Sequence, residues 1–122
     1  MLKIIELAVV WYDVKDMARA RAFYEGVLNL TPTTAADHEY GQWVEYEFGP
    51  YALSLWRGPE PRPGPGGATA ALEMEDFDAA IAHLKSHNVT FQMEPFETPV
   101  CHMAMIADPE GNTICIHKRK AK

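Results

Sequence analysis

The sequence predicts an α+β fold built from a repeated unit of one strand, one capped helix and further strands. Asp16 and Asp76 lie 60 positions apart, and each precedes an amphipathic run in the place where a helix N-cap belongs. A stretch rich in proline and glycine separates the two copies. Because the elements repeat in the same order, we expect a pseudo-twofold arrangement whose two sheets line one shared cleft.

The first half is predicted to contain a strand, a helix and a hairpin. After Asp16, apolar residues such as Met17, Ala20 and Val27 recur at three- and four-residue steps, so one helix face packs on the sheet. Alternating apolar and polar residues, interrupted by Gly49 and the proline after it, are typical of two paired strands. The predicted segments are the strand 4–12, the helix 17–28, a polar loop 31–41 that contains His38, and the strands 42–48 and 51–56.

The second half repeats this order after a linker. Residues 57–67 hold four prolines and four glycines, a composition that forbids helix and disfavours a central strand. We therefore divide one domain into module one, 1–57, a linker, 58–67, and module two, 68–122. Module two is predicted to contain the strand 68–74, a helix after Asp76 with the stripe Phe77, Ala80, Ile81 and Leu84, and the strands 90–96, 101–107 and 113–117.

The last two strands are predicted to be joined by a tight turn, Asp108-Pro109-Glu110-Gly111-Asn112. Pro109 fixes φ, Gly111 or Asn112 accepts a positive φ, and Asp108 can accept hydrogen bonds from the backbone that follows it. The chain is therefore expected to end in a hairpin.

Composition limits the function classes. A chain of 122 residues can form one domain that needs neither a disulfide nor a metal to fold. The formal net charge of −6 argues against nucleic acid and anionic membranes as partners. The apolar runs are too short to span a bilayer and no signal peptide is visible, so we expect a cytoplasmic protein. Cys101 and Cys115 fall on adjacent predicted strands; a disulfide is conceivable, and reduced thiols suit a cytosolic chain better.

Four short motifs together resemble one known superfamily. They are Val14-Lys15-Asp16, Ala22-Phe23-Tyr24, Val27-Leu28-Asn29-Leu30 and the turn Asp108–Asn112. The pattern resembles the vicinal oxygen chelate superfamily, which includes glyoxalase, extradiol dioxygenases and the fosfomycin and bleomycin resistance proteins, and it covers the whole chain. The resemblance implies two βαβββ modules whose mixed sheets curl into an open cup, with helices on the convex face, usually in a homodimer.

Metal enzymes of that superfamily take one ligand, typically His, Gln or Glu, from each of four strands. The resemblance places these four positions at Val9, Ser54, Thr69 and Cys115. Of these only Cys115 is a good soft ligand, whereas the hard divalent metals of the family require oxygen and imidazole donors. We therefore expect that the inherited metal site is lost, and we assign no metal, no cofactor and no catalytic residue.

Strand alternation identifies the side chains that would line the cup. With the four ligand positions facing inward, their neighbours two residues away face inward as well. The predicted ligand-binding residues are Trp11, Trp43, Glu45, Trp56, Cys101, Met103, Met105, Cys115 and His117. Aromatic walls together with Glu45 and Glu47 favour a flat, apolar or cationic molecule. Alternatively, these large side chains fill the cup or pack against a dimer partner.

His117 and the two cysteines are the remaining chemical candidates. His117 lies beside a thiol and, if the sheets close as expected, near Glu45; a single strand-end histidine is nevertheless more often solvated or hydrogen-bonded than catalytic. His102 alternates to the opposite face. Cys101 and Cys115 could bind a soft metal with His117 or act as a redox pair, but the surrounding carboxylates favour inert, buried thiols.

The sequence therefore predicts a metal-free, homodimeric protein that sequesters or senses a small aromatic or cationic molecule in an aromatic-lined cup. The alternative is a metal-dependent lyase, isomerase or dioxygenase with a site rebuilt from Glu45, Cys115 and His117, so enzymatic activity stays undecided. A third possibility is a purely structural dimer with a filled cup.

Overall fold

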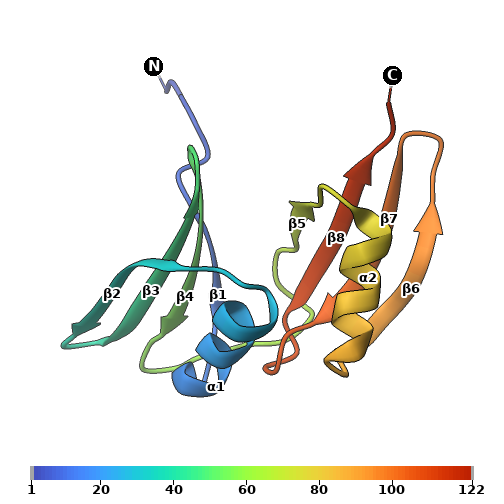
Figure 1. Cartoon of the computed structure of the whole chain (residues 1–122). Helices are drawn as coiled ribbons and strands as arrows, with labels where there is room; N and C mark the ends of the chain where they lie inside the picture. The colour runs from blue at the N-terminus through green and yellow to red at the C-terminus, as the bar shows by residue number, and fades with distance from the viewer. Residues whose placement is uncertain (1, 122) are drawn as a thin grey trace. The chain divides into compact units, whose positions relative to one another are not determined.

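The computed structural model describes residues 2–121, which form two compact units that meet in sequence between Arg62 and Pro63 (Figure 1). Each unit contains one helix and one four-stranded mixed sheet. This arrangement confirms the predicted α+β class and its repeat of strand, helix and three strands. The two units are described in turn.

The first unit contains a sheet in the order β1-β4-β3-β2. β1 runs parallel to β4, and the two other pairs are antiparallel. Its elements are β1 (Val10–Asp13), α1 (Met17–Arg21), the π-helical segment η1 (Ala22–Val27), β2 (Pro32–His38), β3 (Gly41–Phe48) and β4 (Tyr51–Arg57).

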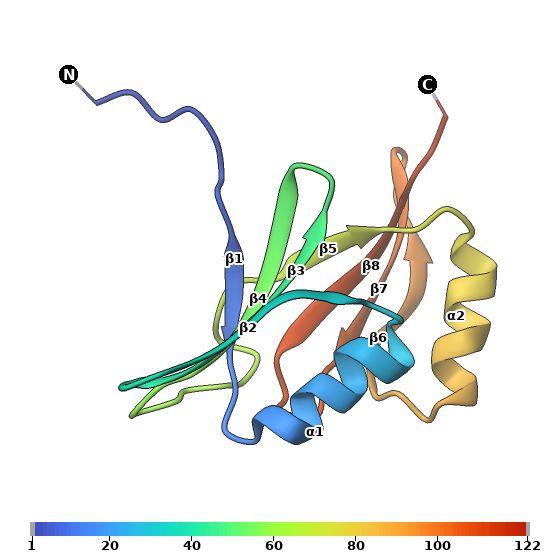
Figure 2. The same ribbon diagram turned by 60° about the vertical axis from the view of Figure 1, so that its left-hand side comes forward.

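The helix of this unit packs on one face of the sheet. The Tyr24 ring stacks on the Tyr46 ring with a centroid distance of 6.0 Å, and both side chains are fully buried. Leu53 and Leu55 of β4 are buried on the same face, as the alternation predicts. Figure 2 shows α1 and β1–β4 from a second direction. The opposite face of this sheet is therefore the one that presents the predicted tryptophans.

The second unit has the same design. Its sheet has the order β5-β8-β7-β6, again with one parallel pair, β5 with β8. The buried core under the helix is formed by Leu84, Ala104, Ile106, Ile114 and Ile116. The elements are β5 (Ala70–Glu73), α2 (Phe77–Ser86), β6 (Phe91–Glu97), β7 (Cys101–Ala107) and β8 (Thr113–Arg119).

Both helices are capped as the sequence predicts. Asp16 Oδ1 accepts a hydrogen bond from the Arg19 amide, and Asp76 Oδ1 accepts one from the Ala79 amide, each at 3.0 Å. Shortly after each helix, Asn29 and Asn88 adopt positive φ values of 59° and 57°. Asparagine tolerates this left-handed conformation, in which the chain leaves a helix. The repeat therefore extends to the signals that end each helix.

The predicted turn between β7 and β8 is present and forms a buried hydrogen-bonded cluster. Asp108 Oδ1 accepts the amides of Glu110 and Asn112 at 2.8 and 2.9 Å, while Gly111 has a φ of 87°. The Asn112 side chain donates to Asp108 Oδ2 at 3.0 Å and accepts the Gly64 amide at 2.9 Å. The turn thus fixes the start of the second unit as well as the final hairpin.

Two predicted boundaries in the first unit are wrong. The first strand was expected over 4–12 but is limited to Val10–Asp13, because Val10 pairs with Leu53 and β4 begins only two residues earlier, at Tyr51. The polar segment around His38 was expected to be a loop but forms β2, an edge strand. An edge strand needs only one partner, here β3, and tolerates a polar sequence on both faces.

Candidate functional site

The face of the first sheet opposite α1 carries all three tryptophans of the chain. Trp43 and Trp56 are directly paired across β3 and β4, and Trp11 of β1 is paired with Ser54. Side chains alternate along each strand, so these positions share one face while Val44 and Leu55 point to the helix. We call this surface the indole face and define it by Trp11, Trp43 and Trp56.

The three indoles and His38 line a hollow of about 300 Å³. The centroids of Trp11 and Trp43 are 5.7 Å apart with planes at 66°, and those of Trp43 and Trp56 are 6.3 Å apart at 56°. The first pair has the edge-to-face geometry that aromatic pairs favour, and the second is tilted. Trp11 is nevertheless 53% exposed, so the indoles do not close over the hollow.

Glu45 is held beside the indoles. Its Oε1 accepts the Trp43 indole N–H at 3.1 Å and the Ser54 hydroxyl at 3.4 Å. Ser54 is fully buried, which fixes one end of this contact in the sheet. The Glu45 carboxylate is therefore fixed beside the aromatic surface by two neutral donors.

Two glycines make room for Trp56. A Cβ on Gly58 would lie 2.5 Å from Trp56 Nε1, and one on Gly41 would lie 2.0 Å from the Arg57 carbonyl oxygen and 3.0 Å from the Trp56 ring. Any side chain at either position would therefore displace the indole or the strand. The Trp56 indole also borders a second hollow of about 300 Å³. This hollow is lined by Asp13, Trp56, Gly58, Pro59, Glu60 and Pro61.

His38 is a lining residue that the sequence did not identify. It was assigned to a loop, but it is the last residue of β2 and pairs with Gly41. No signal in the sequence distinguishes it, because a polar edge strand has the composition of a loop. Only its pairing to β3 brings its imidazole to the hollow.

The other predicted site residues lie on one face of the second sheet. Met103 is paired with His117, and Met105 with Cys115, across β7 and β8. Cys101 follows the same alternation and is buried at 6% exposure. The α2 face of this sheet is identified by His102, whose ring centroid lies 5.7 Å from that of Phe77 in α2. The structure therefore groups the other five residues on the opposite face: Cys101, Met103, Met105, Cys115 and His117.

His117 has a carboxylate partner, but it is Glu73. His117 Nδ1 and Glu73 Oε1 are 2.6 Å apart, and Glu73 Oε2 accepts the Arg119 amide at 2.7 Å. The bonds from the Arg119 amide and then from His117 hold the pKa of Glu73 below its ordinary value. The sequence did not identify Glu73, which reaches His117 because its strand β5 lies directly beside β8. His117 is thus hydrogen-bonded within its own sheet.

Both cysteines are reduced and buried. Cys101 Sγ lies 3.1 Å from the Thr98 hydroxyl, and Cys115 Sγ is directed at the Ile116 carbonyl at 3.7 Å. Burial, and secondarily the proximity of Cys101, raises the pKa of Cys115. A thiol that resists ionisation is a poor nucleophile at neutral pH, so nothing here activates Cys115.

The four positions that the resemblance assigns to a metal carry side chains that do not suit a divalent ion. Val9 has no donor atom, and the Ser54 hydroxyl is committed to Glu45. Cys115 would have to lose a proton that burial retains, and Thr69 offers only a neutral hydroxyl. Within residues 2–121, no group of three or more His, Cys, Asp or Glu side chains is placed to hold a metal ion.

Sequence comparison gives one family and one curated relative. The sequence model of the Glyoxalase/Bleomycin resistance protein/Dioxygenase superfamily matches residues 7–116. The uncharacterized protein YaeR of Escherichia coli (strain K12) is 30% identical over 108 residues, which cover 79% of this chain and 82% of YaeR.

Structural comparison finds the same fold in proteins of several named activities. TnmS3, an antibiotic binding protein from Streptomyces sp. CB03234, superposes with a TM-score of 0.84 at 24% identity, covering 98% of this chain and 100% of TnmS3. A glyoxalase/bleomycin resistance protein from the same strain gives 0.76 at 25% identity, with 94% and 100% coverage. Lactoylglutathione lyase from Agrobacterium tumefaciens gives 0.75 at 15% identity, with 95% coverage of each chain.

Proposed function

Because the chain belongs to the Glyoxalase/Bleomycin resistance protein/Dioxygenase superfamily, we propose that it binds a small aromatic or cationic molecule at the indole face without a divalent metal. TnmS3, which shares the fold, is described as an antibiotic binding protein, so the fold is compatible with binding rather than catalysis. The side chains at the four assigned positions support a metal-independent function, because they include neither a carboxylate nor an imidazole.

The observation that carries the proposal is the convergence of three indoles on one partly open hollow. Large aromatic side chains are normally buried, and leaving them in water forgoes roughly 25 cal/mol for each Å² of apolar surface. Trp11 keeps 53% of its surface exposed beside the hollow. A planar or apolar ligand would cover this surface, whereas in the free protein no described side chain does.

A thermal-shift screen followed by isothermal titration tests the proposal. A panel of planar, apolar and cationic compounds is expected to contain compounds that raise the unfolding temperature of chelator-treated protein. Trp11→Ala should weaken their binding at least tenfold while leaving the fold intact, because Trp11 is half exposed. Tyr51→Ala is the matched control, since Tyr51 is 69% exposed and does not line the hollow. Equal losses in both variants would contradict binding at the indole face.

Elemental analysis separates this proposal from a metal-dependent enzyme. Protein purified without chelators is expected to contain less than stoichiometric Zn, Ni, Mn or Fe, and binding is expected to survive dialysis against EDTA. One equivalent of such a metal, together with ligand binding or turnover that requires it, would support a lyase, isomerase or dioxygenase instead.

We also propose that the two units are modules of a single domain and that the chain forms a homodimer in the cytoplasm. Leu2, Ile4, Ile5 and Leu7 are between 75% and 86% exposed, and a second copy would cover these apolar side chains. Two reduced cysteines suit a reducing compartment. Among residues 2–121, no helix is long and apolar enough to span a membrane.

A further inference from the structure

The residues that line the hollow on the indole face indicate which class of ligand it binds. This inference rests on the proposed function. We infer that the hollow of Trp11, Trp43, Trp56 and His38 is a site for an N-alkylated ammonium group, such as a trimethylammonium head, rather than for a neutral or anionic group. The argument rests on the ring geometry, the bonding of Glu45 and the charges around the hollow.

The ring geometry presents aromatic surface from several directions. Successive indole planes are inclined by 66° and 56°, so the three rings cannot all lie parallel to one flat ligand. A compact group with methyls on all sides can contact inclined walls at once, whereas a planar ring can stack on only one of them. A cation over an indole face also gains from the ring quadrupole, and tryptophan is the strongest of the aromatic side chains in this respect.

The bonding of Glu45 strengthens that attraction. Trp43 donates its indole N–H to Glu45 Oε1 at 3.1 Å. A hydrogen bond to a carboxylate polarises the donor and adds electron density to the indole ring, which deepens the negative potential over its face. The same bond commits the N–H of Trp43, so this group is not free to bind a carbonyl or an anion.

The charges of this unit favour a positive ligand. Residues 1–62 contain nine Asp and Glu against six Lys and Arg. Glu45 lies at the edge of the hollow, while Asp13 and Glu60 line the second hollow beside Trp56. Arg57, the last residue of β4, is bonded elsewhere: its Nε donates to Gln42 Oε1 at 2.9 Å. Local charge therefore attracts a cation and opposes an anion.

The hollow offers few hydrogen-bond acceptors, which favours an ammonium ligand whose nitrogen carries alkyl groups in place of hydrogens. An ammonium that carries N–H groups requires an acceptor for each when it leaves water. Glu45 Oε1 already accepts two hydrogen bonds, so Oε2 and at most one ring nitrogen of His38 remain as side-chain acceptors, fewer than the three N–H groups of a primary ammonium require. A nitrogen whose hydrogens are replaced by methyl groups has no such requirement and presents apolar surface to the rings.

An isosteric pair of probes tests the inference. Choline and its neutral analogue 3,3-dimethyl-1-butanol have nearly the same shape and differ in the charge of the head group. Isothermal titration of the purified 122-residue chain is expected to show at least tenfold tighter binding of choline. If the two bind within twofold of each other, the inference is wrong while the proposed function stands. If a neutral planar compound binds at the indole face and choline does not, the inference is wrong as well.

A charge-removing substitution provides a second test. Glu45→Gln keeps an acceptor for the Trp43 indole N–H but removes the negative charge. We expect it to weaken choline binding three- to tenfold and to leave the neutral analogue unaffected. Glu39→Gln is the matched control, because it removes the same charge from an exposed turn of the same unit that does not line the hollow. Equal affinities of choline for wild type and Glu45→Gln would overturn the inference, and thermal unfolding of both variants verifies that they fold.

Discussion

Glu25 shows how one partly buried charge is accommodated between helix and sheet. Its Oε2 accepts the Arg21 Nε at 2.6 Å and the Tyr46 hydroxyl at 2.9 Å. Burial opposes ionisation of Glu25, but the bonds from Arg21 and Tyr46 outweigh it, so the pKa of Glu25 lies below its ordinary value of 4.5. Burial, and then the bond to Glu25, raises the pKa of Tyr46. The Tyr46 hydroxyl therefore keeps its proton, and its bond to Glu25, well above neutral pH.

Removal of that donor is expected to destabilise the first unit. Tyr46→Phe preserves the stack on Tyr24 but leaves Glu25 with one partner fewer. A hydrogen bond to a charged group contributes about 1.5 to 3 kcal/mol, and the part-exposed carboxylate can recover some of this from water. We expect the free energy of unfolding in urea to fall by about 1 to 2 kcal/mol. An unchanged value would show that the bond is not important for stability.

The lowered pKa of Glu25 also predicts the direction of acid destabilisation. A carboxyl that ionises more readily in the folded chain stabilises it above its ordinary pKa, 4.5 here. This stability is lost as the pH falls through the lower, folded-state pKa. Urea unfolding between neutral pH and pH 3 should therefore show a decline in the acid range that is shallower in Glu25→Gln. Identical slopes for the two proteins would contradict the assignment.

Side-chain direction was the best-predicted property of single residues. Alternation from the assumed inward positions placed the three tryptophans on one face and Val44, Tyr46, Leu53 and Leu55 on the other, where all four are buried. His38 and the bond between Glu73 and His117 could not be predicted. Both depend on which strands become neighbours, and alternation within one strand carries no such information.

At the scale of elements, the helix caps are the local signals that start each module. Asp76 occupies an extended backbone conformation and binds the Ala79 amide, which otherwise has no partner within the helix. Such a cap contributes about 1 kcal/mol. The cap was predictable because it depends only on residues three positions apart.

Substitution of this cap has a clear control within the same helix turn. Asp76→Ala is expected to lower the free energy of unfolding by about 1 kcal/mol, measured in urea. Asp78→Ala removes an acidic side chain from the first turn but keeps the cap. It should therefore lower the free energy of unfolding by only about 0.3 kcal/mol, because it loses a favourable interaction with the helix dipole. Equal effects of the two substitutions would mean that charge, rather than the capping bond, accounts for the stability.

The strand boundaries that were wrong share a physical cause. β1 begins at Val10 because its partner β4 begins at Tyr51, and β2 forms because β3 offers it an edge. Strand limits depend on the partner strand, whereas helix limits are encoded in the local sequence. The strand Cys101–Ala107 was predicted correctly because the turn at Asp108 fixes where it ends.

At the scale of the whole molecule, the repeat of two βαβββ units was predictable, but the ligand was not. The repeat follows from the spacing of two caps and one linker in a single chain. The proposed ligand class rests on the ring inclinations and on the bond from Trp43 to Glu45, and neither can be derived from the sequence.

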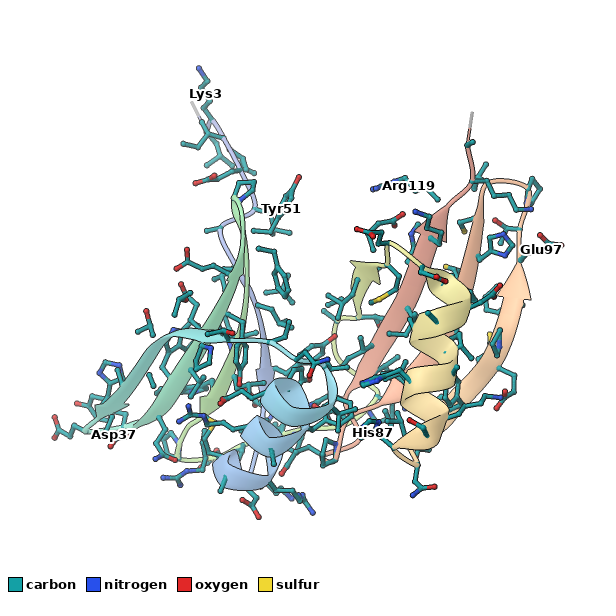
Figure 3. The ribbon with its side chains drawn as sticks, viewed as in Figure 1. Lys3, Asp37, Tyr51, His87, Glu97 and Arg119 are labelled. Atoms are coloured by element: carbon teal, nitrogen blue, oxygen red, sulfur yellow. The ribbon has the colours of Figure 1, made fainter. Side chains whose placement is uncertain are left out.

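The proposed homodimer predicts the behaviour of the N-terminal segment. Figure 3 shows Lys3 in this segment, beyond β1, and the apolar residues around it are exposed. Ile4→Glu with Ile5→Glu should convert a dimer into a monomer in analytical ultracentrifugation, because two charges would be buried in the contact. Lys3→Glu changes charge without removing apolar surface and should leave the dimer intact. A wild-type protein that is monomeric at high micromolar concentration would refute the proposal.

The central claim is that the indole face is the binding surface, and the chain has one indole N–H for each of its three tryptophans. The most direct measurement is a titration of ¹⁵N-labelled protein with phenyltrimethylammonium, a probe that is both planar and cationic. We predict saturable shifts of all three indole N–H resonances and an unmoved Gly49 amide, in the turn that follows β3. Saturable binding that leaves the indole resonances in place, or a complete absence of shifts, would contradict the account.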